Sequence, residues 1–146
     1  MEVQELHRGR LIDHVQLVVQ DINASRRFYD AIFAALGIPL GGTIGNSFWY
    51  DELFVSPNGG PETIGLLTGR VHLAFQAKDL AMVENFHKAG IAGGGKDNGA
   101  PGTRPYHPGY YAAFLTDPDG NNIEAVYHGP ATRNVDAVVV TAETPG

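Results

Sequence analysis

The chain has 146 residues, a net charge of −6 and no cysteine. This length supports one domain, which buries roughly 70% of the surface that its unfolded chain exposes. The lack of cysteine excludes disulfides and thiolate metal sites and fits a cytoplasmic protein. Because the charge is negative and Lys and Arg do not cluster, we expect no nucleic-acid partner. The apolar runs are far shorter than the ~18 residues that suggest a membrane span, so we expect no membrane partner.

The first half of the chain predicts a strand, a helix and further short strands. Residues 11–20 alternate in the manner of a strand and place His14 on one face. Asp21 or Asn23 can cap a helix whose apolar side chains recur at helical spacing until Gly37. Short strand-like segments follow at 43–50 and 53–55.

The second half has the same order of elements. Residues 70–77 predict a strand that carries His72, and a helix follows from Asp79 to Gly90. Residues 91–109 are rich in Gly and Pro and predict a long loop, which in a compact domain is usually functional or mobile. A hairpin is expected at 110–128, around a turn of sequence Asp-Pro-Asp-Gly.

The two halves match in register. His14 and His72 are 58 residues apart, and so are Phe28 and Phe86. The repeat predicts an α+β fold of two paired β-α-β-β-β modules, in which each helix covers one sheet face. The faces left uncovered would form a curved mixed sheet around a cup for a metal or a substrate. Module one would span 11–68 and module two 70–128, together a single domain at 11–128.

The two ends of the chain lie outside the repeat. Residues 1–10 predict a polar N-terminal lead-in, and residues 129–146 predict a C-terminal tail. Residues 137–141 can add one strand, at a sheet edge or on a partner chain.

Three side chains are candidates for one metal site. Glu124 interrupts an apolar run, and a buried carboxylate needs a partner because a bare buried charge is costly. His14 and His72 occupy equivalent positions on strand faces that we assign to the cup. Two neutral imidazoles and a carboxylate can bind a divalent cation and leave coordination positions open. The alternative is that both His residues bond to the backbone and that Glu124 is an exposed edge residue.

The chain resembles the vicinal oxygen chelate superfamily, which includes the glyoxalases, bleomycin-resistance proteins and extradiol dioxygenases. The resemblance covers about residues 11–128. It rests on the segments LIDHVQLVVQDINASRRFYDAIFAALG, VHLAFQAKDLAMVENFHKAG and YYAAFLTDPDGNNIEAVYH. It implies paired modules around a metal cup, with ligands on the first and last strand of each module. His14, His72 and Glu124 match three of those positions.

The fourth ligand position of the family falls on Phe54, which cannot bind a metal. Glu52 lies two residues away and would reach the site only through a shift in register. The resemblance therefore departs from the four-ligand site of glyoxalase I. It is closer to the set of two His and one carboxylate in the dioxygenases, although those enzymes usually have four modules. Drug-binding members of the superfamily often have no metal.

Further candidates lie in the predicted loop and on the strands. Arg104 can hold an anionic substrate, and Tyr111 or His107 can move protons as catalytic residues. Trp49, Phe54 and Tyr111 can line the cup as substrate-binding residues. The alternative for these side chains is packing of the core and the loop, with Arg104 in solvent.

Two functions follow from the resemblance. The first is a metal-dependent enzyme that uses Fe, Mn, Ni or Zn to act on a small substrate through adjacent oxygens, as a lyase, an isomerase or a dioxygenase. The alternative is a protein of the bleomycin-resistance type that binds a small molecule without converting it; a scaffold that has lost catalysis is a third. A homodimer is compatible with each, since open sheet edges tend to pair.

Overall fold

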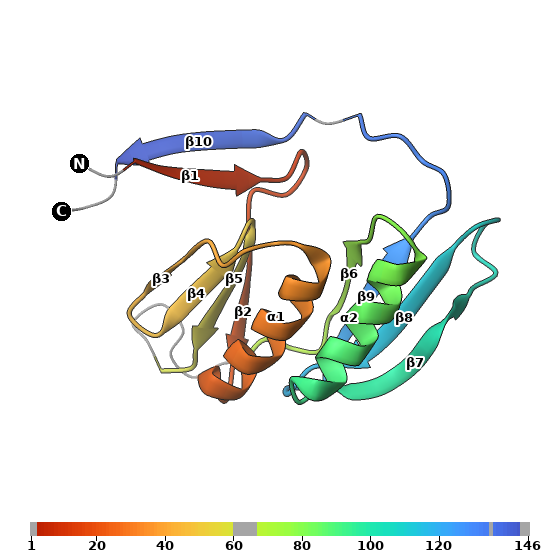
Figure 1. Ribbon diagram of the computed structural model, residues 1–146. Coiled ribbons are helices and arrows are strands. Elements are labelled where there is room, and N and C mark those ends of the chain that lie inside the picture. The colour runs from red at the N-terminus through yellow and green to blue at the C-terminus, as the bar shows by residue number, and fades with distance from the viewer. Residues whose placement is uncertain (1–2, 60–66, 135, 144–146) are drawn as a thin grey trace.

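The structure, a computed structural model, describes residues 3–59, 67–134 and 136–143 (Figure 1). It confirms an α+β fold of two β-α-β-β-β modules. The elements are β1 (Val3–Arg8), β2 (Val15–Val19), α1 (Ile22–Leu36), β3 (Gly42–Ile44), β4 (Ser47–Tyr50), β5 (Leu53–Pro57), β6 (His72–Gln76), α2 (Leu80–Ala92), β7 (Lys96–Thr103), β8 (Tyr111–Thr116), β9 (Asn122–Tyr127) and β10 (Val138–Glu143).

Each module forms its own four-stranded sheet. Module one has the order β2-β5-β4-β3 and module two the order β6-β9-β8-β7, so the first strand of each module pairs with its last. These pairs are parallel, whereas the other neighbours are antiparallel. The two modules that match in sequence therefore also have the same strand order.

The helix termini follow local chemistry. The carboxylate of Asp21 accepts from the backbone N–H groups of Asn23 and Ala24 and caps α1, which ends where Gly37 adopts a φ of 75°. Asp79 caps α2 as predicted. The predicted end of α2 at Gly90 is wrong, because the helix continues to Ala92.

The predicted loop at 91–109 is wrong in its centre. Residues 96–103 form β7, the outer strand of its sheet, although they contain two glycines and one proline. The pairing of β7 with β8 shifts register between Asp97 and Gly99 and again between Gly99 and Gly102. Edge strands with bulges accept Gly and Pro because a missing ladder bond costs little there.

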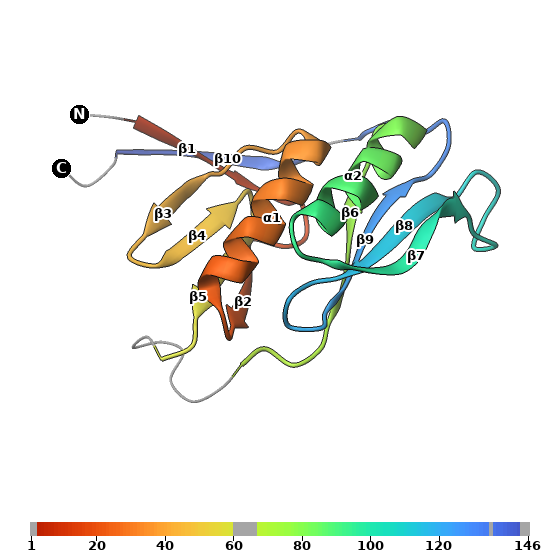
Figure 2. The same ribbon diagram turned by 60° about the horizontal axis from the view of Figure 1, so that its bottom comes forward.

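The helices lie side by side and share one apolar core with the inner sheet faces (Figure 2). The ring of Phe33 on α1 meets that of Phe75 on β6, with centroids 5.0 Å apart. The buried Tyr29 hydroxyl donates to Asp117 Oδ2 at 2.6 Å, which ties α1 to the β8–β9 turn. Both contacts join module one to module two and fix their relative orientation.

The two ends of the chain pair with each other. Residues 3–8 form β1, which pairs antiparallel with β10, so the predicted lead-in is largely a strand. The predicted strand at 137–141 corresponds to β10, and the ribbon extends beyond the modules (Figure 1). Val138, Val139 and Val140 are exposed on it. Within the described ranges, no helix has the length and hydropathy needed to cross a membrane.

Candidate metal site

His72 and Glu124 meet on the outer face of module two. They lie on the parallel neighbours β6 and β9, where Ala74 pairs with Glu124 and His72 with Asn122. Leu73 and Phe75 pack into the shared core, so the alternate residues of β6 face away from it. Glu124 is 2% exposed, and its Oε1 lies 2.9 Å from His72 Nε2. The carboxylate that looked misplaced in an apolar strand is therefore buried and paired.

The second ring nitrogen of His72, Nδ1, shows which nitrogen of the ring carries a hydrogen. His72 Nδ1 lies 3.0 Å from the backbone oxygen of Asn122. A carbonyl oxygen only accepts, so Nδ1 carries the hydrogen. In a neutral imidazole the lone pair is then on Nε2, which faces the carboxylate. Two lone pairs at this distance repel, so the arrangement calls for a proton or a cation between Nε2 and Oε1.

Tyr110 completes the surroundings of Glu124. Its hydroxyl donates to Glu124 Oε2. Burial, followed by this carboxylate, raises the pKa of Tyr110 to about 12. The hydroxyl therefore stays protonated near neutral pH and keeps donating to the carboxylate.

Tyr110 was missed by the sequence reasoning, which selected Tyr111. The Tyr111 hydroxyl donates to Glu84 Oε1 on α2 at 3.0 Å, on the helix-covered side. The signal was available in the alternation of β8. Phe114 pairs with Glu124, and Tyr110 lies four residues before it, so both belong to the outer face.

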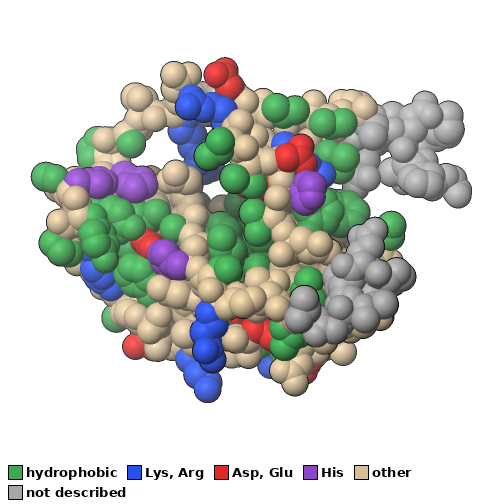
Figure 3. Space-filling view, turned by 180° about the vertical axis from the view of Figure 1, so that it is seen from behind, with side chains coloured by type: hydrophobic (Ala, Val, Ile, Leu, Met, Phe, Trp, Pro, Cys, Tyr) green, Lys and Arg blue, Asp and Glu red, His purple; other side chains and the backbone are tan. Residues whose placement is uncertain are grey.

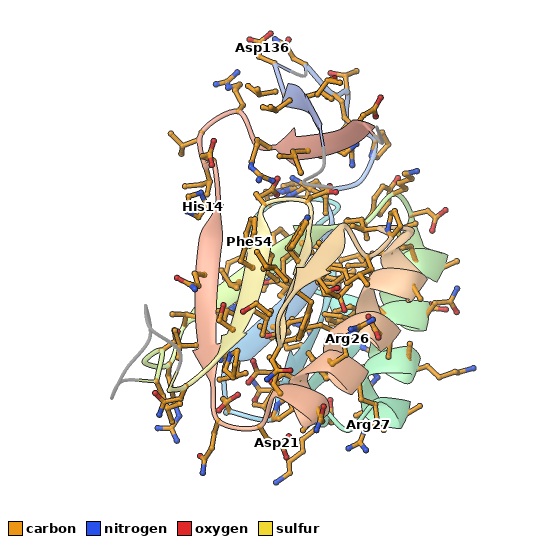
Figure 4. All side chains as sticks on the ribbon, turned by 90° about the vertical axis from the view of Figure 1, so that its left-hand side faces the viewer. His14, Asp21, Arg26, Arg27, Phe54 and Asp136 are labelled. Atoms are coloured by element: carbon orange, nitrogen blue, oxygen red, sulfur yellow. The ribbon has the colours of Figure 1, made fainter. Side chains whose placement is uncertain are left out.

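His14 lies just before β2, on module one. Its Nδ1 is 2.7 Å from Asp13 Oδ1, so the carboxylate holds the hydrogen on Nδ1 and leaves the lone pair on Nε2, as in His72. The His14 ring meets the edge of Phe54 at 5.6 Å. Figure 4 shows His14 and Phe54 on the sheet, away from Arg26 and Arg27 on α1.

Phe54 occupies the position in module one that Glu124 occupies in module two. Gln16 pairs with Phe54 as Ala74 pairs with Glu124, at the offset of the repeat. Trp49 stacks on Phe54 at 5.4 Å, and the Arg8 guanidinium lies 5.2 Å from the centre of the same ring. This position is thus filled by an aromatic stack.

Glu52 lies in the turn before β5, and its backbone oxygen accepts from Val15 N at 2.8 Å. Burial raises the pKa of its carboxyl group. The β2–β5 register is regular, so no slip in pairing moves Glu52 into the place of Phe54.

The three predicted ligands do not gather within one chain. Among residues 3–59, 67–134 and 136–143, no three His, Asp or Glu side chains lie close enough to hold one ion. The chain brings His72 to Glu124 and leaves His14 on the sheet of the other module. Figure 3 shows the side opposite the helices, where His and hydrophobic side chains lie together.

Two other predicted residues lie near the pair. The guanidinium of Arg104 lies 5.2 Å from the centre of the Phe114 ring, and Phe114 stacks on His72 with centroids 6.1 Å apart. His107 Nε2 is 2.9 Å from His128 Nδ1, and both rings meet Tyr110 edge-on. Aromatic and imidazole rings and the guanidinium of Arg104 therefore lie around His72 and Glu124.

Comparison with known proteins agrees with this architecture. A family model described as Glyoxalase/Bleomycin resistance protein/Dioxygenase superfamily matches residues 11–125. The chain belongs to this superfamily. A glyoxalase/bleomycin resistance protein from Albidiferax ferrireducens T118 is 32% identical; the match covers 80% of this chain and 98% of that one, with a TM-score of 0.66.

More distant solved structures share the superfamily fold alone. A glyoxalase-related enzyme from Fulvimarina pelagi is 20% identical, covers 85% of this chain and 94% of its own, and gives a TM-score of 0.65. A lactoylglutathione lyase from Agrobacterium tumefaciens is also 20% identical, with coverages of 77% and 90% and a TM-score of 0.56. No curated protein matched the sequence.

Proposed function

We propose that this superfamily member is a metal-dependent enzyme in which His72 and Glu124 would hold the cation. The observation that carries the proposal is the 2.9 Å approach of His72 Nε2 to Glu124 Oε1 while Nδ1 of the same ring is held by a backbone carbonyl. Metal-bound His residues almost always donate their other N–H to such an oxygen. The buried Glu124 would supply the negative charge that the cation needs.

The chemistry of the two side chains fits a divalent cation. The separation of 2.9 Å is that of an ordinary hydrogen bond between a protonated His72 and Glu124, and a cation that replaces this proton would be held by the same two side chains. A divalent ion of the Fe, Mn, Ni or Zn class accepts this mixture of imidazole and carboxylate. When bound, it would supply Lewis-acid stabilisation of a substrate oxyanion.

A second copy of the chain would complete the site with its His14. Within the described residues His14 stays apart from the other two, yet its Nδ1 is bonded to Asp13, as His72 Nδ1 is bonded to a backbone oxygen. The helices cover one face of each sheet, so the opposite faces are available to another copy. A homodimer with two-fold symmetry would pair module one of each copy with module two of the other and build two equal sites.

The chain's own residues have separate roles in this proposal. Tyr110 holds Oε2 of Glu124 by donation and keeps Oε1 directed at His72. Phe114 stacks on one side of the His72 ring, and the His72 side chain is otherwise half exposed. Phe54 and Trp49 form an apolar wall on the opposing module. Substrates with adjacent oxygens would bind here, and lyase, isomerase and dioxygenase reactions all fit the same stabilised oxyanion.

The second candidate is a small-molecule-binding protein that needs no metal. It is favoured by the ability of a protonated His72 to satisfy Glu124 directly at 2.9 Å. Under this alternative the aromatic side chains would bind the ligand by stacking, and a chelator would leave binding unchanged.

A thermal shift separates the two candidates. A cation that binds only the folded chain raises Tm. Chelator-treated protein should therefore gain Tm when Mn²⁺ or Zn²⁺ is added, and Glu124→Gln should gain none. His87→Ala is the matched control, since His87 Nε2 also lies 2.9 Å from a carboxylate, that of the exposed Asp97. A gain that Glu124→Gln retains, or none in the wild type, contradicts the metal proposal.

A further inference from the structure

Arg104 contacts Phe114, whose ring stacks on His72 of the proposed metal site. It follows β7, and its guanidinium carbon is 5.2 Å from the centre of the Phe114 ring. Phe114 pairs with Glu124 across β8 and β9 and stacks on His72. The Arg104 guanidinium, the Phe114 ring and the proposed ligands His72 and Glu124 are therefore in consecutive contact on the outer face of module two.

The charge of Arg104 has no carboxylate partner among the residues that the structure describes. Its Nη1 donates to the backbone oxygen of Thr103 at 3.2 Å, and its Nη2 donates to that of Ala100 at 2.8 Å. These carbonyl groups orient the guanidinium but do not neutralise it. A guanidinium has five N–H donors, so donors remain for a further acceptor. Arg27 is likewise held by a backbone oxygen, that of Gly93, and has no ion pair among the described residues. It is therefore the place of Arg104 beside Phe114 that singles it out.

Arg8, on β1, provides a comparison within the same chain. Arg8 lies over Phe54, at the same 5.2 Å, and Phe54 contacts His14. Arg8, however, forms an ion pair with Asp13 at 3.5 Å, and its side chain is largely buried. The two contacts differ in detail, because Arg8 lies on β1 and His14 meets Phe54 edge-on, whereas His72 stacks on Phe114. Of the two Arg residues that lie over a Phe ring, Arg8 has a carboxylate partner and Arg104 has none among the described residues.

Two glycines of β7 lie against the guanidinium of Arg104. A Cβ atom at Gly102 would lie 3.0 Å from Arg104 Nη1, and one at Gly99 would lie 3.3 Å from Nη2. Both distances are shorter than ordinary van der Waals contact. A Cβ atom at Gly99 would also lie 2.9 Å from Phe114 Cδ2, so β7 passes close to both the ring and the guanidinium.

We propose that Arg104 binds a carboxylate of the substrate. Guanidinium and carboxylate groups match as planar, bidentate hydrogen-bonding partners, and such charge-assisted bonds are strong. The substrate class of the proposed enzyme is then a small carboxylic acid that also carries two adjacent oxygen atoms, and this inference rests on the function proposed above. The acid group would lie against Arg104, with the adjacent oxygens directed at the side of His72 and Glu124.

The test compares two probes of nearly equal shape, 3,4-dihydroxybenzoate and 3,4-dihydroxybenzamide, of which only the first carries a charged carboxylate with two acceptor oxygens. Calorimetric titration of the Mn²⁺-loaded wild type should give about tenfold or more tighter binding of the acid than of the amide. Arg104→Met should remove this preference and leave amide binding unchanged. Arg104→Gln, which can still bond to the carbonyl oxygens, should lose the preference too and guards against a folding defect. Arg27→Met is the control, because Arg27 lies on α1, away from the sheet face that carries His14 and Phe54 (Figure 4).

Each outcome bears on one proposal. Equal affinity of the wild type for acid and amide, no acid binding at millimolar concentration, or a preference that persists in both Arg104 variants overturns the role of Arg104. A preference for the acid that depends on Arg104 but is unaffected by a chelator supports Arg104 and contradicts the metal site. The two proposals therefore fail separately.

Discussion

The Tyr110 hydroxyl donates to one oxygen of Glu124 while the other oxygen faces His72. This relationship makes Tyr110 a positioning residue for the proposed ligand. Changing a residue that supports a metal ligand typically lowers metal affinity 10–100-fold. We therefore expect Tyr110→Phe to weaken Mn²⁺ binding within that range in a calorimetric titration. Tyr111→Phe is the matched control and should bind as the wild type does, because its hydroxyl bonds to Glu84. Equal affinity of the two variants would contradict this role.

Mixing two inactive variants tests whether the site is shared between copies. His14→Ala and His72→Ala would each lack a ligand in both sites of a homodimer. After the two are mixed and allowed to exchange subunits, half of the dimers combine them, and each such dimer has one intact site. We expect metal binding to return to about a quarter of the wild-type level, measured on the re-purified mixture. If the mixture binds no more metal than the separate variants, a metal site shared between two copies is excluded.

Alkaline pH should lower the stability of the folded chain through Tyr29, which links α1 to the β8–β9 turn. Burial and then the neighbouring Asp117 raise the pKa of Tyr29 well above its ordinary value of 10.0. Above pH 10 the unfolded chain releases the Tyr29 proton and the folded chain retains it, so the unfolded state binds fewer protons and stability falls as pH rises. Below pH 10 the stabilisation is fully present. Urea unfolding from pH 8 to 11 should show this fall, with a shallower slope in Tyr29→Phe; parallel slopes would exclude the contribution of Tyr29.

Gly90 should be required for the packing of α2 on β8. A Cβ atom there would lie 2.1 Å from Leu115 Cδ1 and 3.1 Å from Ile32 Cγ2. Overpacking of this kind typically costs about 1–3 kcal/mol. Gly90→Ala should lower the free energy of unfolding by that amount in urea titrations. Gly69→Ala, with nothing within 4 Å of its Cβ, is the control and should stay within about 0.5 kcal/mol of the wild type. A neutral Gly90→Ala would show that Leu115 can move aside.

The repeat was the part of the fold that the sequence predicted best. The spacing from His14 to Phe28 equals that from His72 to Phe86 because the two modules have the same strand order. The equal register of β2 with β5 and of β6 with β9 places Phe54 and Glu124 at equivalent positions. The parallel pairs make the first and last strand of each module neighbours. The side-chain contact between His72 and Glu124 follows from that topology.

Three features escaped prediction for physical reasons. β7 is an edge strand, where glycine and register shifts are tolerated, so its composition indicates a loop. The pairing of β1 with β10 joins residues at opposite ends of the chain, which local patterns do not report. Tyr110 and Tyr111 are identical neighbours, and only the face of β8 separates the one that reaches Glu124 from the one that reaches α2.

The central claim is that His72 and Glu124 hold a divalent cation. The most direct measurement is the metal content of the purified chain after growth with Fe, Mn, Ni and Zn, with a titration of His72→Ala and His87→Ala beside the wild type. We predict near-stoichiometric metal in the wild type and in His87→Ala, and its loss in His72→Ala. A metal-free wild type that also fails to bind any of these ions on titration, or metal retained in His72→Ala, would contradict the claim.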